Sequence, residues 1–395
     1  MTERRSSAWW LCSLVLTGCA VDTHATGRGV SPEDAGPDGS LARGVQQTPV
    51  TDDEDAGGLD AGADAAMIDA AVLDASAHDA SADARADAQV NLEDAGYPEL
   101  LSQTGLYQNI ALDLTERDVM SFQPKFMLWS DGATKRRWLR LPAGEQIDTS
   151  DMDAWDFPVG TKAWKEFRVN GVRVETRMLH KDAEDHWVMI AYRWRADQQD
   201  ADAAPLGETN VLGTPHDIPD ETLCSHCHNQ QGVLLGVSAI QLSLTLPGQN
   251  LMGLARAGLL SHAPLKNFQI PGGPLAESAL GYLHANCGHC HRPNTPVYEQ
   301  ILKRGPRTGG PIFWERTDRL DTLVNTTGYA STVLQPNSVL PDLHIIEPGY
   351  PEESEMVIRA SQRGEGTLQM PPLGTEVVDQ AGLKQIKDWI TSLKK

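Results

Sequence analysis

The 395-residue sequence is short of thiols, of aromatic rings and of positive charge. It has six cysteines and 6% aromatic residues, and 33 Lys+Arg against 54 Asp+Glu give a net charge of −21. Two cysteines, Cys12 and Cys19, lie in an N-terminal export segment, and the other four form two CxxC pairs, so no thiol is left over for a disulfide framework. The acidic balance argues against nucleic acid as a partner. The apolar run from Ala8 to Leu16 is too short to remain as a membrane span.

The N-terminus has the features of a signal peptide. Arg4 and Arg5 precede the apolar run, and Leu16-Thr17-Gly18-Cys19 resembles the lipobox of bacterial lipoproteins. We therefore expect residues 1–19 to be a lipoprotein signal peptide and Cys19 to be lipidated, which would anchor the chain in the outer membrane, facing the periplasm or the cell surface. Ordinary secretion with an incidental Cys19 is the alternative. Both place the folded part outside the cytoplasm.

Residues 20–96 are dominated by Asp, Ala and Gly. From residue 20 to residue 95 there are 17 Asp+Glu and 3 Arg, so this stretch carries −14 of the total charge. It has too little apolar surface to offset the entropy of ordering, and we expect a disordered, extended linker. An Ala-rich amphipathic helix lacks an apolar stripe, and the regular Asp spacing lacks the EF-hand pattern of a calcium site.

The remaining four cysteines form two CxxCH motifs, Cys224-Ser-His-Cys227-His228 and Cys287-Gly-His-Cys290-His291. This spacing is that of covalent c-type haem attachment, in which two thiols join the porphyrin and the adjacent histidine binds iron. We expect two haems, held by Cys224, Cys227, Cys287 and Cys290, with His228 and His291 as iron ligands. A zinc site using both CxxC pairs is a rival, although its pairs usually lie closer in sequence. A redox dithiol is another, but it would follow a strand and begin a helix.

Residues 97–204 are expected to form a β-rich domain, an antiparallel meander or sandwich. Alternating runs at 135–141, 164–169, 172–179 and 187–194 predict strands, and Asn170-Gly171 predicts a hairpin turn. Six of the ten tryptophans fall here, either as core residues or as walls of a haem or ligand site. Lys135, Arg136 and Arg137 are candidates to pair with haem propionates, or they form a solvated strand end.

Residues 205–273 contain the first motif and are too few for a complete cytochrome, so we expect the β domain to cover one side of the haem. The run Leu251–Leu260 has helical spacing. The sequence after His228 contains no residue whose surroundings mark it as the second axial ligand of this haem. Met252 and His262 are candidates, and Met178 and His180 are weaker ones.

Residues 274–395 are expected to form an α-helical domain around the second motif. A helix over 275–286 leads into Cys287, Ser354 is a natural N-cap for another, and an amphipathic helix over 377–394 ends the chain. Met370, in a loop fixed by two following prolines, is the candidate second ligand of this haem. A core methionine is the alternative.

The C-terminal stretch resembles class I cytochrome c, on Cys287–His291, Met370-Pro-Pro and the helix with Trp389-Ile390. From about residue 97 onward the chain resembles a family of bacterial diheme c-type cytochromes of unassigned role. The matching segments are Trp129–Ala133, Phe157–Thr161, Glu175–Leu179, Tyr192–Trp194, Cys224–His228 and Ala285–Pro293. The resemblance implies the haem residues named above, and the long insertion between Asn294 and His344 departs from a minimal cytochrome c.

These features predict an α+β protein with a tryptophan-rich antiparallel domain followed by two haem segments. A six-coordinate His/Met haem has no open position for substrate, which favours a carrier of single electrons over an enzyme. Two alternatives stay open. One is a peroxidase- or oxidase-like enzyme whose open first haem is fed by the second, and the other is a β domain that docks redox partner proteins.

Overall fold

The computed structural model describes residues 96–228, 233–245, 249–303, 310–336, 339–364 and 366–394. All of these belong to the compact unit Gly62–Lys395. The expected signal peptide, the lipidated Cys19 and the expected linker up to residue 95 lie outside the described residues. No helix in the described part is long and apolar enough to cross a membrane.

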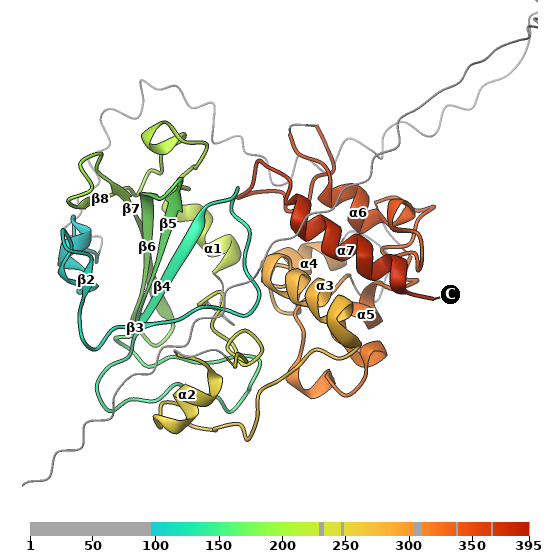
Figure 1. The fold of residues 1–395 in the computed structure, drawn as a ribbon, viewed down its shortest axis with the longest axis horizontal. Helices are drawn as coiled ribbons and strands as arrows, with labels where there is room; N and C mark the ends of the chain where they lie inside the picture. Colours follow the sequence, from blue (N-terminus) through green and yellow to red (C-terminus); the bar gives the residue numbers. More distant parts are fainter. Residues whose placement is uncertain are drawn as a thin grey trace, which may run out of the picture. The chain divides into compact units, whose positions relative to one another are not determined.

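The first half of the described chain is built on a six-stranded antiparallel sheet in which every strand pairs with its neighbour in sequence (Figure 1). The strands are β3 (Met120–Ser121), β4 (Thr134–Arg140), β5 (Lys162–Val169), β6 (Val172–Ala183), β7 (His186–Trp194) and β8 (Ala201–Ala203). A two-stranded sheet, β1 (Tyr107–Asn109) with β2 (Leu114–Thr115), precedes it after the 3-10 turn η2 (Leu101–Gln103). The predicted antiparallel meander is confirmed.

The hairpin between β5 and β6 turns where the sequence predicts it. Val169 pairs with Val172, and the two residues between them, Asn170 and Gly171, have φ of 50° and 84°. A two-residue turn with both φ positive matches the twist of the flanking strands, and Asn-Gly is the dipeptide that adopts it most easily.

Strand alternation divides the large sheet into two different faces. One face packs the tryptophan core, which contains Trp138, Trp164, Met178, Ile190 and Trp194. The opposite face carries Leu139, Ala163 and Leu179, which pack with Val233, Leu234, Leu251 and Leu254 from beyond the first motif. The segment around the first motif thus shares a core with the sheet, as its small size predicts. Among the tryptophans of this part, Trp138, Trp155, Trp164 and Trp194 are buried core residues.

The second half of the described chain is mainly helical and irregular. Its helices are α3 (Gly273–Asn286), α4 (Pro296–Lys303), α5 (Thr327–Thr332), α6 (Glu355–Ala360) and α7 (Gln380–Ser392), with α1 (Glu221–Cys227) and α2 (Leu251–Arg256) before them. Single 3-10 turns are η3 (Val211–Gly213), η4 (Thr317–Arg319), η5 (Leu323–Asn325) and η6 (Pro351–Glu353). The insertion after Asn294 therefore folds partly as α4, η4, η5 and α5.

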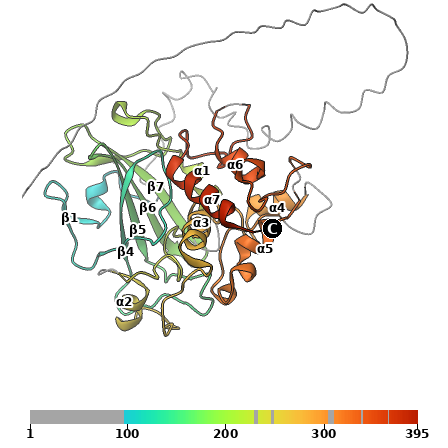
Figure 2. The same cartoon turned by 45° about the vertical axis from the view of Figure 1, so that its right-hand side comes forward.

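Helices α3 and α7 pack side by side and build the helical core (Figure 2). Leu383, Ile386, Trp389 and Ile390 recur at helical spacing along α7, and all are buried. They meet Ala276, Ala279, Leu280 and Leu283 of α3. Removing a tryptophan or leucine of this size from water contributes roughly 1.5–3 kcal/mol per side chain. The terminal helix is shorter than predicted, because Asp379 caps it by accepting a hydrogen bond from the Gly382 N–H.

Ser354 begins α6 as predicted, but its side chain does not cap the helix. The hydroxyl instead accepts a hydrogen bond from the Glu347 N–H at 2.9 Å and donates one to the Tyr350 carbonyl at 3.0 Å. The buried hydroxyl is used to hold the preceding turn, so this part of the prediction was wrong.

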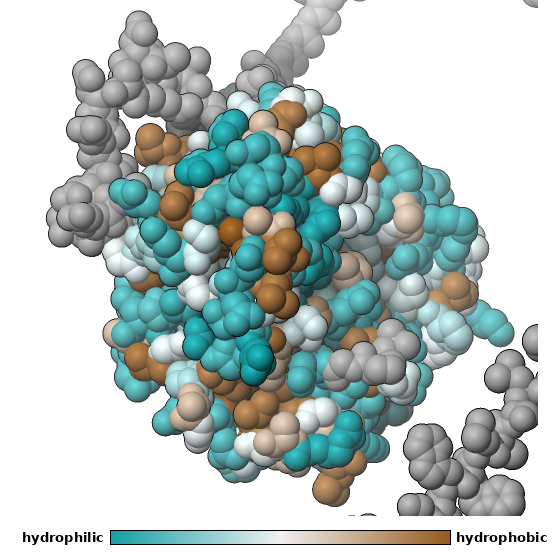
Figure 3. Space-filling view, turned by 60° about the vertical axis from the view of Figure 1, so that its left-hand side comes forward, coloured by the Kyte–Doolittle hydropathy of each residue, from teal (hydrophilic) through white to brown (hydrophobic). Residues whose placement is uncertain are grey.

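The surface of the β-rich part is mostly hydrophilic on the face shown in Figure 3, with apolar residues scattered between polar ones. Exposed large apolar side chains include Leu112, Leu114 and Val172. Scattered single apolar residues are normal on protein surfaces.

Candidate functional site

The first CxxCH motif lies in α1, on the face of the sheet opposite the tryptophan core. The Asp220 carboxylate caps α1 by accepting hydrogen bonds from the Thr222 and Leu223 N–H groups at 2.9 and 3.2 Å. Cys224 and Cys227 then lie one turn apart, and His228 ends the helix, its N–H donating to the Cys224 carbonyl at 2.9 Å. The helix therefore includes the two cysteines of the motif.

The imidazole of His228 is held in one orientation. Its Nδ1 lies 2.6 Å from the Val233 carbonyl oxygen, an acceptor, so Nδ1 carries the proton and Nε2 is left with a lone pair. Burial lowers the pKa of His228 to about 4, and the positive charges of Lys165 and Arg177 also lower it. A neutral imidazole with one oriented lone pair is what a metal ligand requires.

The second motif follows the C-terminal end of α3. The Cys287 N–H donates to the Leu283 carbonyl at 2.8 Å, and the His291 N–H donates to the Cys287 carbonyl at 2.9 Å. A helix that runs into the motif contradicts the dithiol arrangement, in which the cysteines would begin a helix. The His291 ring meets Phe313 edge-on at 5.3 Å. Its pKa is lowered to about 4 by burial and by Arg359, against the opposing effect of the Pro311 carbonyl.

The two motifs, 63 residues apart in sequence, lie next to each other in space. The Sγ atoms of Cys227 and Cys290 and a ring nitrogen of His289 all lie within 4.8 Å of one another. Contact with Cys290 lowers the pKa of the Cys227 thiol, and the same contact raises that of Cys290. In the described part of the chain these four cysteines form no disulfide, and all are partly buried. This proximity was not predicted from the sequence.

Several buried nitrogen atoms lack hydrogen-bond partners, including one within the second motif. Among the described residues they include Nε2 of His284, Nδ1 of His289 and Nε of Arg137. Buried polar atoms are normally paired, and such orphans indicate a group that binds there. The donor set fits c-type haem, since each motif offers two thiols for covalent attachment and one neutral imidazole for iron.

Met370 lies in the loop between α6 and α7 and is partly buried. Its backbone N–H donates to the Arg359 carbonyl at 3.1 Å, and Arg359 is the residue whose charge acts on His291. The loop that carries Met370 is thus tied to the surroundings of the second motif.

The candidate ligands for the first motif differ in their positions. Met252 is partly buried on α2, whose neighbours Leu251 and Leu254 share a core with Val233. His262 is 67% exposed and hydrogen-bonded to Ser261, which makes it a poor ligand.

Met178 belongs to the tryptophan core, so it lies on the face of the sheet away from the first motif. His180 lies on that face too, because residues two positions apart on a strand project from the same side. Met189, on the near face and packed in the core that contains Val233, is a candidate that the sequence did not single out.

The basic residues Lys135, Arg136 and Arg137 of β4 do not form one solvated strand end, because they lie on two faces of the sheet. Arg136 pairs with Asp113 at 2.6 Å on the tryptophan-core face. Arg137 lies on the opposite face and is only 4% exposed. Lys135 shares that face, where burial lowers its pKa to about 8.

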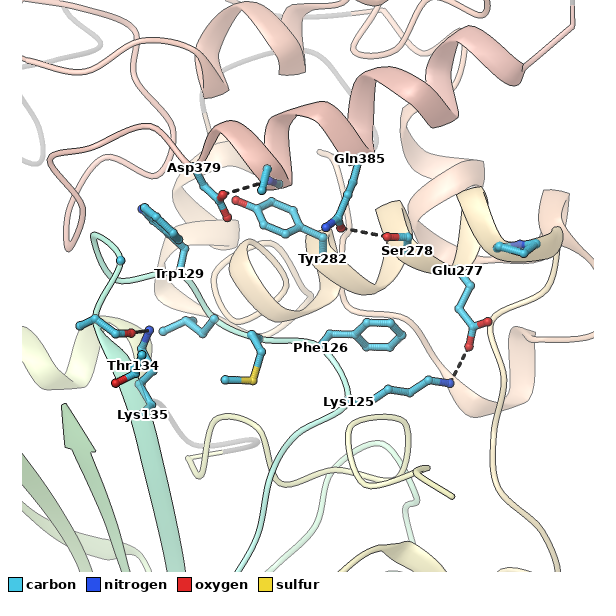
Figure 4. A pocket seen from close by; sticks show the side chains of 17 residues that line it. Lys125, Phe126, Trp129, Thr134, Lys135, Glu277, Ser278, Tyr282, Asp379 and Gln385 are labelled. Carbon is cyan, nitrogen blue, oxygen red and sulfur yellow. Dashed lines mark hydrogen bonds and ion pairs between the residues drawn. The ribbon is translucent and has the colours of Figure 1, made fainter. Parts of the chain in front are cut away.

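A cavity of about 750 Å³ lies between the segment 125–135 and helices α3 and α7 (Figure 4). An ion pair between Lys125 and Glu277 at 2.5 Å and a hydrogen bond from Ser278 to Gln385 at 2.9 Å cross its rim. Trp129 and Tyr282 also line it. The CxxCH cysteines and histidines do not line this cavity, which sets it apart from the site around the two motifs.

No family model, curated protein or solved structure matches this chain.

Proposed function

We propose that the protein is a diheme c-type cytochrome that transfers single electrons outside the cytoplasm. The observation that carries the proposal is the meeting of two complete CxxCH motifs, with Cys227 and Cys290 in contact. Since each thioether ties a porphyrin edge to its cysteine, the two attachment points would be neighbours. Electrons could then pass between two centres within one chain.

The residues of the chain would do the following work. His228, with its Nδ1 proton bound to the Val233 carbonyl, presents Nε2 as an iron ligand. His291 is kept neutral by burial for the same purpose, and Met370 is the proposed second ligand of the second haem. When bound, haem supplies an iron that changes between ferrous and ferric states. The buried, apolar surroundings of both motifs would limit the access of water.

The cellular setting remains part of the proposal. The lipobox-like sequence at Cys19 and the covalent haem motifs both favour a lipid-anchored protein of the cell envelope whose partners are redox proteins. An enzyme with an open first haem, fed by the second, is the alternative of a different class. It gains support because, in the part of the chain that the structure describes, no second ligand of the first haem stands out by position.

A structural metal site is a second candidate, favoured by one observation. Cys227, His289 and Cys290 are arranged closely enough to bind a zinc ion together. The sequence separation that argued against zinc loses its force, because the fold brings the motifs together. The covalent chemistry of CxxCH still favours haem, since both adjacent histidines are neutral and oriented or buried.

Mass spectrometry of protein matured in a periplasm decides between these candidates. The proposal expects the mass of the chain plus two haems, resistant to acid-acetone extraction, and no zinc. Replacing Cys287 and Cys290 by alanine should leave one haem. A chain with stoichiometric zinc and no haem would exclude the proposal.

A further inference from the structure

Three positive side chains form a row across the centre of the large sheet. Arg137 of β4 pairs in register with Lys165 of β5, and Lys165 pairs with Arg177 of β6. Directly opposed residues of antiparallel strands project from the same face. This is the face that carries Leu139, Ala163 and Leu179 in the next row. The row therefore lies on a covered face of the sheet, which also carries Lys135 and Glu175 in the row on its other side.

The row has more positive charge than its partners balance. Arg177 pairs with the buried Glu175 at 2.5 Å, and Glu175 is shared with His216 at 2.7 Å. Among the described residues, Glu175 is the only carboxylate in a salt bridge with the row. The Lys165 ammonium lies 4.8 Å from the centre of the Phe167 ring, and Arg137 Nε has no hydrogen-bond partner.

The crowding of these cations has an electrostatic consequence. Burial, followed by the charges of Arg137 and Arg177, lowers the pKa of Lys165 well below its ordinary value. Burial alone lowers the pKa of Arg137 to about 10. Buried charges are normally paired, because leaving them unpaired is costly. A row of this kind is stable as a charged group only when it binds an anion.

The row lies at the first motif. The charges of Lys165 and Arg177 act on the imidazole of His228, and Arg177 and Cys224 act on each other. Helix α1, which holds Cys224 and Cys227, contacts β7 of the same sheet. Any group bound by the first motif would therefore lie within electrostatic reach of the row.

We infer that Arg137, Lys165 and Arg177 form an anion cradle that binds the carboxylate side chains of the haem attached at the first motif. The inference rests on the proposed function, and it assigns these residues a positioning role. A haem carries two propionates, which match the excess of positive charge in the row. Nearby cations favour the less positive ferrous state, so the cradle would also raise the reduction potential of this haem.

The test compares charge removal on the two faces of one sheet in the matured diheme protein. Lys165→Met and Arg137→Gln remove a charge from the row. Arg140→Gln is the matched control, because Arg140 is on β4, faces the other side and pairs with Asp118 at the surface. Haem content is measured by mass spectrometry, and both reduction potentials are measured by spectroscopic redox titration.

The cradle predicts that each row variant lowers one of the two potentials while the control does not. The expected change is on the order of tenfold in the equilibrium constant of reduction, or about 59 mV for one electron. Lys165→Arg keeps the charge and should keep the potential. If Lys165→Met loads haem poorly, Lys165→Arg still gives a variant at this position whose potential can be measured.

Three results would overturn the inference. The first is that neither reduction potential shifts more in the row variants than it does in Arg140→Gln. Another is an equal loss of potential in Lys165→Arg and Lys165→Met. The third is a wild-type potential that follows phosphate concentration at constant ionic strength, with no such response in Lys165→Met, since the row would then bind a free anion. A wild-type chain without haem would contradict the proposed function instead.

Discussion

Single residues already decide much of the chemistry of the two motifs. His228 and His291 have lowered pKa values near 4, chiefly because they are buried. Both imidazoles are therefore neutral at physiological pH and available as ligands. The positions of two methionines also differ. Met178 belongs to the tryptophan core, on the face of the sheet away from the first motif, whereas Met370 lies in a loop that is hydrogen-bonded to Arg359.

Replacing Met370 by alanine should lower the reduction potential of the second haem, because a thioether ligand favours ferrous iron. The weak near-infrared band of methionine ligation should also disappear from the absorption spectrum. Met356→Ala is the control, since Met356 is a core residue of α6. It should lower stability by about 2–5 kcal/mol and keep the band. An unchanged band in Met370→Ala would make Met370 a core residue only.

Asp153 should make stability depend on pH. Its carboxylate is 8% exposed and accepts hydrogen bonds from the Thr317 N–H at 2.9 and 3.1 Å. Burial raises its pKa from 3.8 to about 6, against those hydrogen bonds and the charge of Arg316. The folded state thus holds this proton more tightly than the unfolded state. The resulting stabilisation is full below about pH 4 and is lost as the pH rises through about 6.

Asp153→Asn should remove that dependence. Urea unfolding at several pH values measures the free energy of unfolding. Between pH 4 and 6 the wild-type value, relative to that of Asp153→Asn, should fall by up to about 1.4 kcal/mol per pH unit. Asp185→Asn, at an exposed position in the β6–β7 turn, should keep the wild-type slope. Identical slopes in wild type and Asp153→Asn would show that Asp153 titrates normally.

At the scale of elements, the end of α3 sets the geometry of the second motif. A Cβ atom on Gly288 would lie 2.6 Å from the His284 carbonyl oxygen and 3.1 Å from the Trp314 backbone. Backbone atoms cannot move aside as a flexible side chain can. The motif therefore needs glycine at this position, between helix α3 and the irregular segment that contains Trp314.

Gly288→Ala should destabilise the protein by about 1–3 kcal/mol through overpacking. Thermal unfolding followed by circular dichroism measures this loss. Equal stability of Gly288→Ala and wild type would show that the backbone of Trp314 can shift.

Local patterns allowed several elements to be predicted from the sequence, and the register and packing between elements could not be. Asn170-Gly171 fixed its own hairpin, and the spacing of Leu383, Ile386 and Trp389 fixed the buried side of α7. The row of Arg137, Lys165 and Arg177 needed the register of three strands, which no single segment contains. Ser354 failed as a cap because its hydroxyl binds backbone groups of the preceding turn, the Glu347 N–H and the Tyr350 carbonyl.

At the scale of the whole molecule, the contact between the two motifs is the feature that the sequence did not disclose. Long-range contacts also join the segments that hold them. The Trp129 N–H donates to Asn286 at 2.7 Å, just before the second motif, and Asp153 binds Thr317. Such bonds keep the sheet and the helical core in a fixed relation near the cysteines. The two proposed haem sites would therefore act as one unit.

Electron paramagnetic resonance of the fully oxidised, matured protein tests this central claim most directly. Haems attached at neighbouring cysteines should interact magnetically, so the wild-type spectrum should differ from the sum of two single-haem spectra. Those spectra come from Cys224→Ala/Cys227→Ala and Cys287→Ala/Cys290→Ala. Two ferric signals that interact in the wild type and separate cleanly in the variants are the expected result. A wild-type spectrum equal to the sum, or one without ferric haem, would contradict the account.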